Sequence, residues 1–131
     1  HTNSCPETID RVIDSYPHEQ QSQVRTMLST ALQAVITQSL LRRADTQGRV
    51  AAHEIMIVNP AIRNLIRENK LHQIPSIMQT SKGEGMQTME ECLRNLAYRR
   101  EITRDQAILQ ANDPKLFEGS EDPRTRRTGR S

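Results

Sequence analysis

The stretch from Gln38 to Val58, QSLLRRADTQGRVAAHEIMIV, decides which fold class this sequence belongs to. Two apolar runs flank Ala44-Asp45-Thr46-Gln47-Gly48, in which Asp, Thr and Gly favour a turn. The run after the turn contains several β-branched residues, which is typical of a strand. We therefore predict a β-hairpin with strands over 38–42 and 49–58. Because residues 55–58 are continuously apolar, we expect the second strand to be covered on both faces.

Two helical patterns precede the hairpin. A capping box at Ser4 and Glu7 opens the first helix, which ends at Pro17. Its predicted inward face consists of Ile9, Val12, Ile13 and Tyr16. The second helix has apolar residues at alternating steps of three and four, which predict a buried stripe: Val24, Met27, Leu28, Ala31, Leu32, Val35 and Ile36.

More helices follow the hairpin. In the stretch NPAIRNLIRE (59–68), Asn59 can cap a helix and Pro60 fits its first position. A helical stretch over 71–80 is expected to break at Pro75, and a loop follows at 81–85. Capping boxes at Thr88 and Thr103 open the last two helices. The predicted inward residues are Ala61, Ile62, Leu65, Ile66, Met89, Cys92, Leu93, Leu96, Ile102 and Ala107. Beyond residue 113 we expect a disordered tail.

Composition narrows the function classes. The chain has 131 residues, which fits a single domain, and a net charge of +2. That charge lies in the tail after Ser120, where four Arg face Glu121 and Asp122, so the body is balanced. A nucleic-acid binder usually has a basic body with aromatic platforms, and this body has neither. The two cysteines are far apart in sequence, which predicts a reduced cytoplasmic protein without a disulfide framework. Since the sequence begins at His1 rather than Met, we expect a fragment or a processed product.

Most catalytic motifs fail on spacing. Lys82-Gly83-Glu84-Gly85 is the nearest match to a phosphate loop and does not fit one. His53-Glu54 opens like a zinc motif, but position 57 is Ile, so no metal is expected and Glu54 is predicted to bond locally. Cys5 lies in a first helical turn, which could lower its pKa, although no base accompanies it.

Two features stay open on the residues alone. His1-Thr2-Asn3-Ser4 precedes a helix start, where free amides can bind a phosphate; the alternative is a plain helix start. Arg63 and Arg67 are one turn apart with no acid at i±4. They are either solvated surface arginines or a docking surface for an acidic partner or another subunit.

Several of these stretches resemble the type IV pilus retraction ATPases, the hexameric motors of twitching motility. HTNS at 1–4 is similar to the family's His box, and AIRNLIRE at 61–68 is similar to a motif of its retraction branch. The resemblance continues to about residue 112 through TIDRVIDSYP, RVAAHEIMIV and GMQTMEECLRNLAYRREITRDQA. Outside AIRNLIRE it is shared with pilus-assembly and type II secretion ATPases.

The resemblance implies an α-rich α/β fold, the C-terminal part of a RecA-like ATPase domain, mostly helices with one β-hairpin at the edge of the sheet. It implies that residues 1–58 complete the RecA-like core, 59–112 form a C-terminal helical subdomain, and 113–131 are a tail. The phosphate loop, the magnesium-binding carboxylates and the arginine fingers would lie upstream, after a PAS-like domain.

The resemblance also implies site residues. His1 would be catalytic near the γ-phosphate, and His1 and Thr2 would bind the nucleotide. The retraction motif would serve force transmission and be dispensable for folding, so Arg63→Ala or Arg67→Ala should leave the fold intact. Its residues are Ala61, Ile62, Arg63, Asn64, Leu65, Ile66, Arg67 and Glu68.

The expected function is therefore that of a segment of an ATP-driven pilus retraction motor. The full-length parent would bind ATP and Mg²⁺, whereas this segment alone would bind neither and be inactive. Its partners would be other copies in a homo-hexamer and the pilus machinery of the inner membrane, with no nucleic acid and no membrane span. It would be cytoplasmic and peripheral to the bacterial inner membrane. The alternatives are a related pilus-assembly or secretion ATPase, a helical adaptor for an acidic protein, and a nucleic-acid binder acting through the arginine tail.

Overall fold

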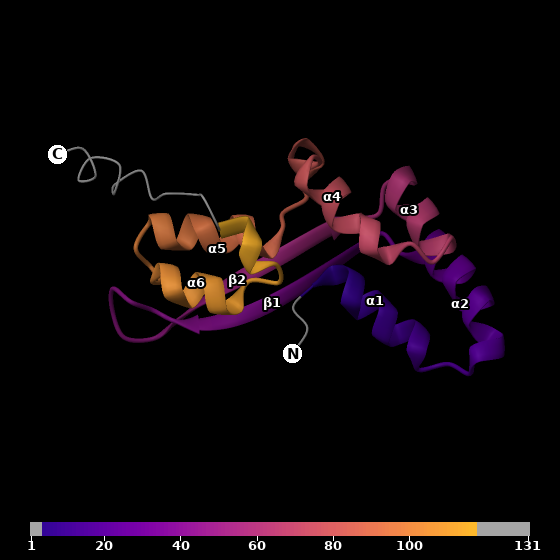
Figure 1. Cartoon of the computed structure of the whole chain (residues 1–131), viewed down its shortest axis with the longest axis horizontal. Coiled ribbons are helices and arrows are strands. Elements are labelled where there is room, and N and C mark those ends of the chain that lie inside the picture. The colour runs from indigo at the N-terminus through magenta and orange to yellow at the C-terminus, as the bar shows by residue number, and fades with distance from the viewer. Residues whose placement is uncertain (1–3, 118–131) are drawn as a thin grey trace.

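In a computed structural model, residues 4–117 form an elongated molecule built on one long β-hairpin (Figure 1); residues 1–3 and 118–131 lie outside the described part. The strands are β1 (Ala34–Arg42) and β2 (Arg49–Ile57). The helices are α1 (Cys5–Asp14), α2 (His18–Ala31), α3 (Pro60–Arg67), α4 (Ile74–Gln79), α5 (Met89–Tyr98) and α6 (Arg104–Gln110). Three 3₁₀ turns complete the fold: η1 (Leu71–Gln73), η2 (Lys82–Glu84) and η3 (Pro114–Phe117). The prediction of a mostly helical chain with one hairpin is confirmed.

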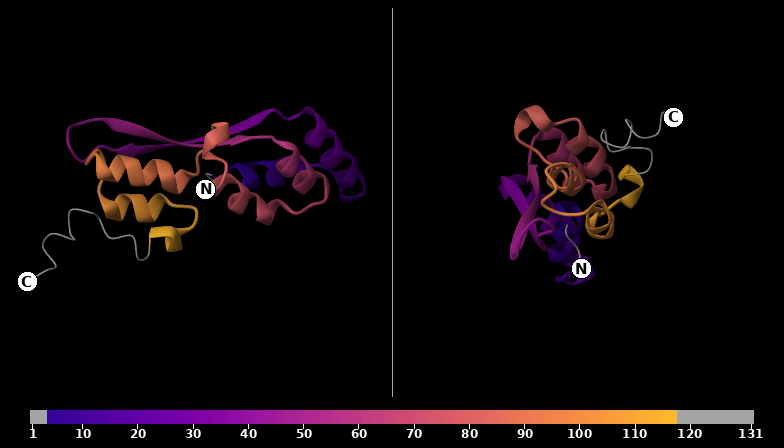
Figure 2. Two further views of the ribbon diagram at one scale, coloured as in Figure 1. Left: turned by 90° about the horizontal axis from the view of Figure 1, so that it is seen from above. Right: turned by 90° about the vertical axis from the view of Figure 1, so that its left-hand side faces the viewer.

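The hairpin is covered on one face only. Its strands are antiparallel, with Val35 opposite Met56 and Thr37 opposite Glu54. The helices lie mainly on one side of it (Figure 2), where alternate residues of both strands are buried. On the other face Ile36 is 63% exposed and Leu40 is 55% exposed. The prediction that the second strand is covered on both faces is therefore wrong, because the apolar run at 55–58 keeps the alternation of a half-buried strand.

The predicted second helix is too long. Helix α2 ends at Ala31, and Val35 and Ile36 belong to β1. Beta-branched residues favour a strand, and these two lie opposite Met56 and Ile55 in the hairpin. The stripe is also poorly buried, since Met27 is 62% exposed. The apolar residues as far as Leu32 have helical spacing because they belong to α2 and its end. Val35 and Ile36 keep the same spacing by coincidence, although they belong to β1.

Two separate apolar clusters hold the helices to the hairpin. The α1–α3 cluster consists of Cys5, Ile9, Ile13, Met56, Val58, Ile62, Leu65, Ile66, Leu71, Ile74, Met78 and Met86. The α5–α6 cluster consists of Leu41, Ala52, Met89, Leu93, Leu96, Ile102, Ala107 and Phe117. Phe117 is 4% exposed. Residues 113–117 are thus part of the packed body and not of the predicted tail, because an aromatic side chain gains by burial. The rest of that prediction, 118–131, lies outside the described residues.

The predicted caps are present. Ser4 Oγ accepts from the Glu7 amide at 3.1 Å, and Thr88 Oγ1 accepts from the Glu91 amide at 3.2 Å. The Thr103 box is complete, since Gln106 also accepts from the Thr103 amide at 2.7 Å. Some details of the prediction are wrong. Pro75 lies in the first turn of α4, where proline is tolerated, instead of breaking it. Ala61, Val12 and Tyr16, which were predicted to face inward, are exposed.

Helices α3 and α5 both end in a residue with left-handed backbone, Asn69 (φ 60°) and Arg100 (φ 61°). At the end of α5 the Glu101 amide bonds to Leu96 O at 2.9 Å and the Arg100 amide to Ala97 O at 3.0 Å, which is a Schellman motif. Glycine adopts this backbone without the steric cost that other residues incur.

Replacing Arg100 by Gly is therefore expected to raise the free energy of unfolding by about 0.5–1 kcal/mol. Urea unfolding followed by circular dichroism measures the change. The matched control is Arg99→Gly, one residue earlier, where φ is −79° and glycine is expected to destabilise by a similar amount. Destabilisation by both variants would contradict the role given to the left-handed backbone.

Within residues 4–117, no helix has both the length and the apolar character that crossing a membrane requires.

Candidate functional site

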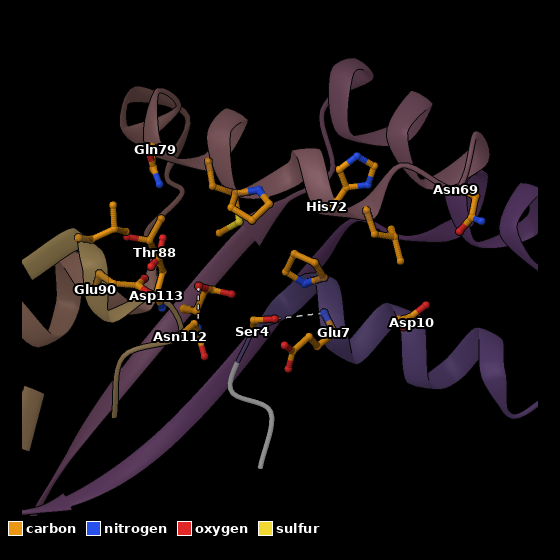
Figure 3. A pocket seen from close by; sticks show the side chains of 16 residues that line it. Ser4, Glu7, Asp10, Asn69, His72, Gln79, Thr88, Glu90, Asn112 and Asp113 are labelled. Carbon is orange, nitrogen blue, oxygen red and sulfur yellow. Dashed lines mark hydrogen bonds between the residues drawn. The ribbon is translucent and has the colours of Figure 1, made fainter. Parts of the chain in front are cut away.

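A pocket of about 600 Å³ lies between the helices of the α1–α3 cluster and those of the α5–α6 cluster (Figure 3). Ser4 and Glu7 line it from the start of α1, and His72 lines it from η1. Thr88 at the start of α5 and Asp113 before η3 line it from the opposite side. The pocket therefore joins segments that are far apart in the sequence.

The pocket is acidic. Its lining includes the carboxylates of Glu7, Asp10, Glu54, Glu90 and Asp113. Among the residues that line it, His72 is the one side chain that can become positively charged. Carboxylates at this density repel phosphate groups. The pocket is thus poorly suited to hold the phosphates of a nucleotide.

Glu54 lies at the floor of the pocket and caps two helices. Its side chain is buried, and Oε2 accepts from the Cys5 amide at 2.6 Å. Oε1 accepts from the Met89 amide at 3.1 Å, and Asn112 Nδ2 lies 3.4 Å from the same oxygen. Cys5 and Met89 are the first residues of α1 and α5, so the carboxylate lies at the partly positive end of both helices. The prediction that Glu54 bonds locally is wrong, since these partners are 49 and 35 residues away.

Two effects act on the pKa of Glu54 in opposite directions. Burial raises the pKa, because it disfavours the charged carboxylate, and the charge of Glu90 adds to this. The amides of Cys5 and Met89 partly offset the rise, because they bond to the charged form. Glu90 is itself buried and accepts from the Asp113 amide at 2.7 Å.

The start of α1 offers no free amide to a phosphate among its first three residues. The Cys5 amide donates to Glu54, Pro6 has no N–H, and the Glu7 amide donates to Ser4. The phosphate-binding alternative, as far as it relied on these amides, is therefore wrong. His1 and Thr2, the predicted catalytic and nucleotide-binding residues, lie outside the described residues.

Neither cysteine has the surroundings of a nucleophile. The Cys5 thiol is fully buried and donates to Val35 O at 3.3 Å. Burial, with a further contribution from the charge of Glu54, raises the pKa of Cys5 to about 12. The expectation that the helix start could lower this pKa is wrong, because burial and, to a lesser extent, the charge of Glu54 raise it. Cys92 is half-buried, and its sulfur accepts from the His53 amide at 3.5 Å.

Alkylation should separate the two thiols. We expect N-ethylmaleimide at pH 8 to modify Cys92 first and Cys5 about 100-fold or more slowly, because Cys5 reacts only after local opening. Intact-mass and peptide mass spectrometry measure both rates. In 6 M urea the rates should become equal, and equal rates in the native chain would contradict the burial of Cys5.

Among residues 4–117, no cluster of three or more His, Cys, Asp and Glu side chains is placed to hold a metal ion. His53 Nε2 instead contacts Gln38 Oε1 at 3.0 Å across the hairpin.

The AIRNLIRE motif forms most of α3 and is part of the core. Asn59 Oδ1 accepts from the Ile62 amide at 2.9 Å, as predicted for the cap. Ile62 and Ile66 are fully buried, and Leu65 is 9% exposed. Since these three side chains belong to the α1–α3 cluster, we expect them to stabilise the fold, whereas the resemblance implied that the helix is dispensable for folding.

The two arginines of the motif have different environments. Arg63 Nη1 donates to Ser29 O and to Thr30 O, the latter at 3.1 Å. Both carbonyls belong to the last turn of α2, where they have no partner within the helix and where positive charge is favoured. Arg63 is thus half-buried and bound to the end of α2, so it is neither fully solvated nor free to dock. Arg67 is exposed and bonds to Asn64 of its own helix.

Neither the distant partners of Glu54 nor the partner of Arg63 was predicted from the sequence. A signal for Glu54 was present, since it occupies a buried position of the alternation between Ala52 and Met56. A carboxylate at such a position requires donors. No comparable signal identified the α2 carbonyls as the partner of Arg63.

Comparison with known proteins places these features in a family. The chain is 50% identical over 117 residues to the type IV pilus retraction ATPase PilT of Pseudomonas aeruginosa, covering 89% of this chain and 34% of that protein. It is 53% identical over 96 residues to a twitching motility protein of Neisseria gonorrhoeae, covering 73% of this chain and 26% of that one. A crystal structure of the pilus retraction motor PilT with bound ADP superposes with a TM-score of 0.77 at 46% identity. That match covers 90% of this chain and 32% of the motor chain.

No family model matches the chain. The chain spans between 26% and 34% of the length of these two curated relatives. The identity to the retraction ATPase extends over 117 of the 131 residues. Over this length the chain belongs to the family of type IV pilus retraction ATPases.

Proposed function

We propose that the chain is the C-terminal segment of a hexameric, ATP-driven motor that retracts type IV pili, in which it packs subunits together and transmits force. The observation that carries the proposal is the 50% identity to a retraction ATPase over 117 residues. The fold agrees, since the ADP-bound retraction motor superposes on 90% of this chain.

The nucleotide would be held mainly by other parts of the parent. The pocket of this segment is acidic, and its nearest glycine-rich loop, 82–85, does not have the spacing of a phosphate loop. ATP and Mg²⁺ would therefore bind to upstream residues of the parent, and the segment alone would bind neither and be inactive. His1 would approach the γ-phosphate as the catalytic residue, with Thr2 beside it.

Force would pass through packed contacts. The α1–α3 cluster contains Cys5 at the start of α1 and Ile62 and Ile66 of α3, so a shift of α1 is transmitted to α3. The exposed residues of the retraction motif, among them Asn64 and Arg67, would meet a neighbouring subunit or the pilus machinery at the cytoplasmic side of the inner membrane.

The uncovered face of the hairpin fits a segment of a larger sheet. Ile36 and Leu40 are 63% and 55% exposed, and a two-stranded sheet is marginal by itself. The remainder of a RecA-like core would cover this face. Residues 1–58 would then complete that core, and 59–112 would form the helical subdomain.

The alternative function, a helical adaptor for an acidic protein, has less support from the structure than from the sequence alone. An acidic protein could not use Arg63 without breaking its bonds to Ser29 and Thr30. Nucleic-acid binding would depend on the arginine tail, which lies outside the described residues, and we propose no nucleic-acid partner.

The proposal is tested on the full-length polypeptide encoded with this segment. We expect it to hydrolyse ATP and support twitching, and we expect the 131-residue chain alone to do neither. His1→Ala should lower kcat at least about tenfold, since removing a group that assists in the transition state typically costs a factor of 10²–10⁴. Arg67→Ala should leave ATP hydrolysis within twofold and weaken retraction. Brisk ATP turnover by the isolated chain would contradict the proposal.

A further inference from the structure

We infer that Glu54 is a positioning residue, which holds the start of α1 at a fixed place relative to the start of α5. The activity expected to depend on this placement rests on the proposed function, whereas the link between the two helices does not.

The place of Glu54 in the hairpin is the first observation. Along the covered face of β2, Ala52 belongs to the α5–α6 cluster and Met56 belongs to the α1–α3 cluster. Glu54 lies between them, so the boundary between the two clusters is a buried carboxylate instead of an apolar side chain. The helices of each cluster lie at opposite ends of the hairpin (Figure 1).

The second observation is that the two carboxylate oxygens of Glu54 accept hydrogen bonds from different helices. Oε2 takes the Cys5 amide at 2.6 Å, and Oε1 takes the Met89 amide at 3.1 Å. Each amide is the first of its helix and has no partner within that helix. One rigid planar group therefore fixes the distance between two helix starts, and a side chain with a single acceptor oxygen cannot replace it.

Fixing these two amides also fixes the residues that lie beside the starts of α1 and α5. Cys5 directly follows Ser4, so fixing the Cys5 amide also fixes the place of Ser4, which caps α1. At the other helix, Glu90 accepts from the Asp113 amide at 2.7 Å, which ties the start of α5 to the segment before η3. A displacement at the start of α1 is thus passed through the Glu54 carboxylate to α5 and on to residue 113, across the floor of the pocket.

The test compares Glu54→Gln with Glu90→Gln in the full-length polypeptide. Both residues are buried carboxylates of the same pocket, but Glu90 serves one donor, which the amide oxygen of Gln can still accept. The first readout is hydrogen–deuterium exchange by mass spectrometry, on peptides covering Cys5 and Met89. We expect exchange at one or both helix starts to become at least tenfold faster in Glu54→Gln and to stay within twofold in Glu90→Gln.

The second readout is ATP hydrolysis. Because Glu54 would position the start of α1 without binding the nucleotide, kcat should fall at least fivefold in Glu54→Gln with KM within twofold. Wild-type exchange at both helix starts in Glu54→Gln would overturn the inference, whatever the polypeptide hydrolyses. Faster exchange with unchanged kcat would also overturn it, since Glu54 would then stabilise without positioning.

Failure of the proposed function gives a different result. A wild-type polypeptide without ATPase activity, combined with faster exchange in Glu54→Gln, would overturn the proposed motor and support the link between the helix starts. If Glu54→Gln does not fold, Glu54→Asp replaces it. Its carboxylate is one methylene shorter and reaches one helix start at a time, so the same exchange pattern is expected, and wild-type exchange at both starts would again overturn the inference.

Discussion

Substituting Arg63 by Ala is expected to lower the free energy of unfolding by about 2–3 kcal/mol, whereas Arg67→Ala should change it by less than about 0.5 kcal/mol. The two residues are one turn apart on α3 and carry the same charge. Arg63 donates to Ser29 O and Thr30 O at the end of α2, and hydrogen bonds to charged groups contribute about 1.5–3 kcal/mol. Arg67 is exposed, and its bond is to Asn64 of its own helix.

Urea unfolding of both variants measures the difference, with the slope of the transition as a check that the unfolded state is unchanged. Arg63→Lys is the informative third variant, because it keeps the charge but loses the guanidinium that reaches both carbonyls. We expect its stability to lie between those of wild type and Arg63→Ala. Equal stabilities of Arg63→Ala and Arg67→Ala would show that the contact with α2 contributes nothing to the stability of the fold.

The second large effect is expected for Ile66→Ala, which should destabilise the fold by about 2–5 kcal/mol. Ile66 is fully buried in the α1–α3 cluster, so its truncation leaves a cavity in that cluster. The matched control is Leu109→Ala on α6, where the side chain is 87% exposed and the expected change is within about 0.5 kcal/mol.

Thermal or urea unfolding of the two variants checks this prediction, and similar stabilities would contradict the packing of α3. The result also decides how motility phenotypes should be interpreted. A loss of retraction in Ile66→Ala would follow from a weakened fold. A loss in Arg67→Ala at wild-type stability would point to a contact with a partner.

The features predicted correctly from the sequence are those determined by neighbouring residues. The caps at Ser4, Thr88 and Thr103 each join residues three positions apart, so a short window of sequence contains both partners. The hairpin was likewise predicted from a turn and the strands beside it.

The features that were missed depend on distant residues. The partners of Glu54 lie 35 and 49 residues away, and those of Arg63 lie 33 and 34 residues away. Periodicity also failed at residues 32–36, because alternating steps of three and four do not reveal where a helix gives way to a strand. The resemblance supplied the family but not these contacts.

The bare apolar side of the hairpin has a practical consequence for anyone preparing this segment by itself. Strand β1, AVITQSLLR, carries one charged residue and contains no proline, so it lacks the gatekeepers that normally keep an outer strand from joining a copy of itself. Concentrated stocks of the 131-residue chain should precipitate, and a lysine placed at Ile36 or Leu40 should restore solubility without disturbing the interior.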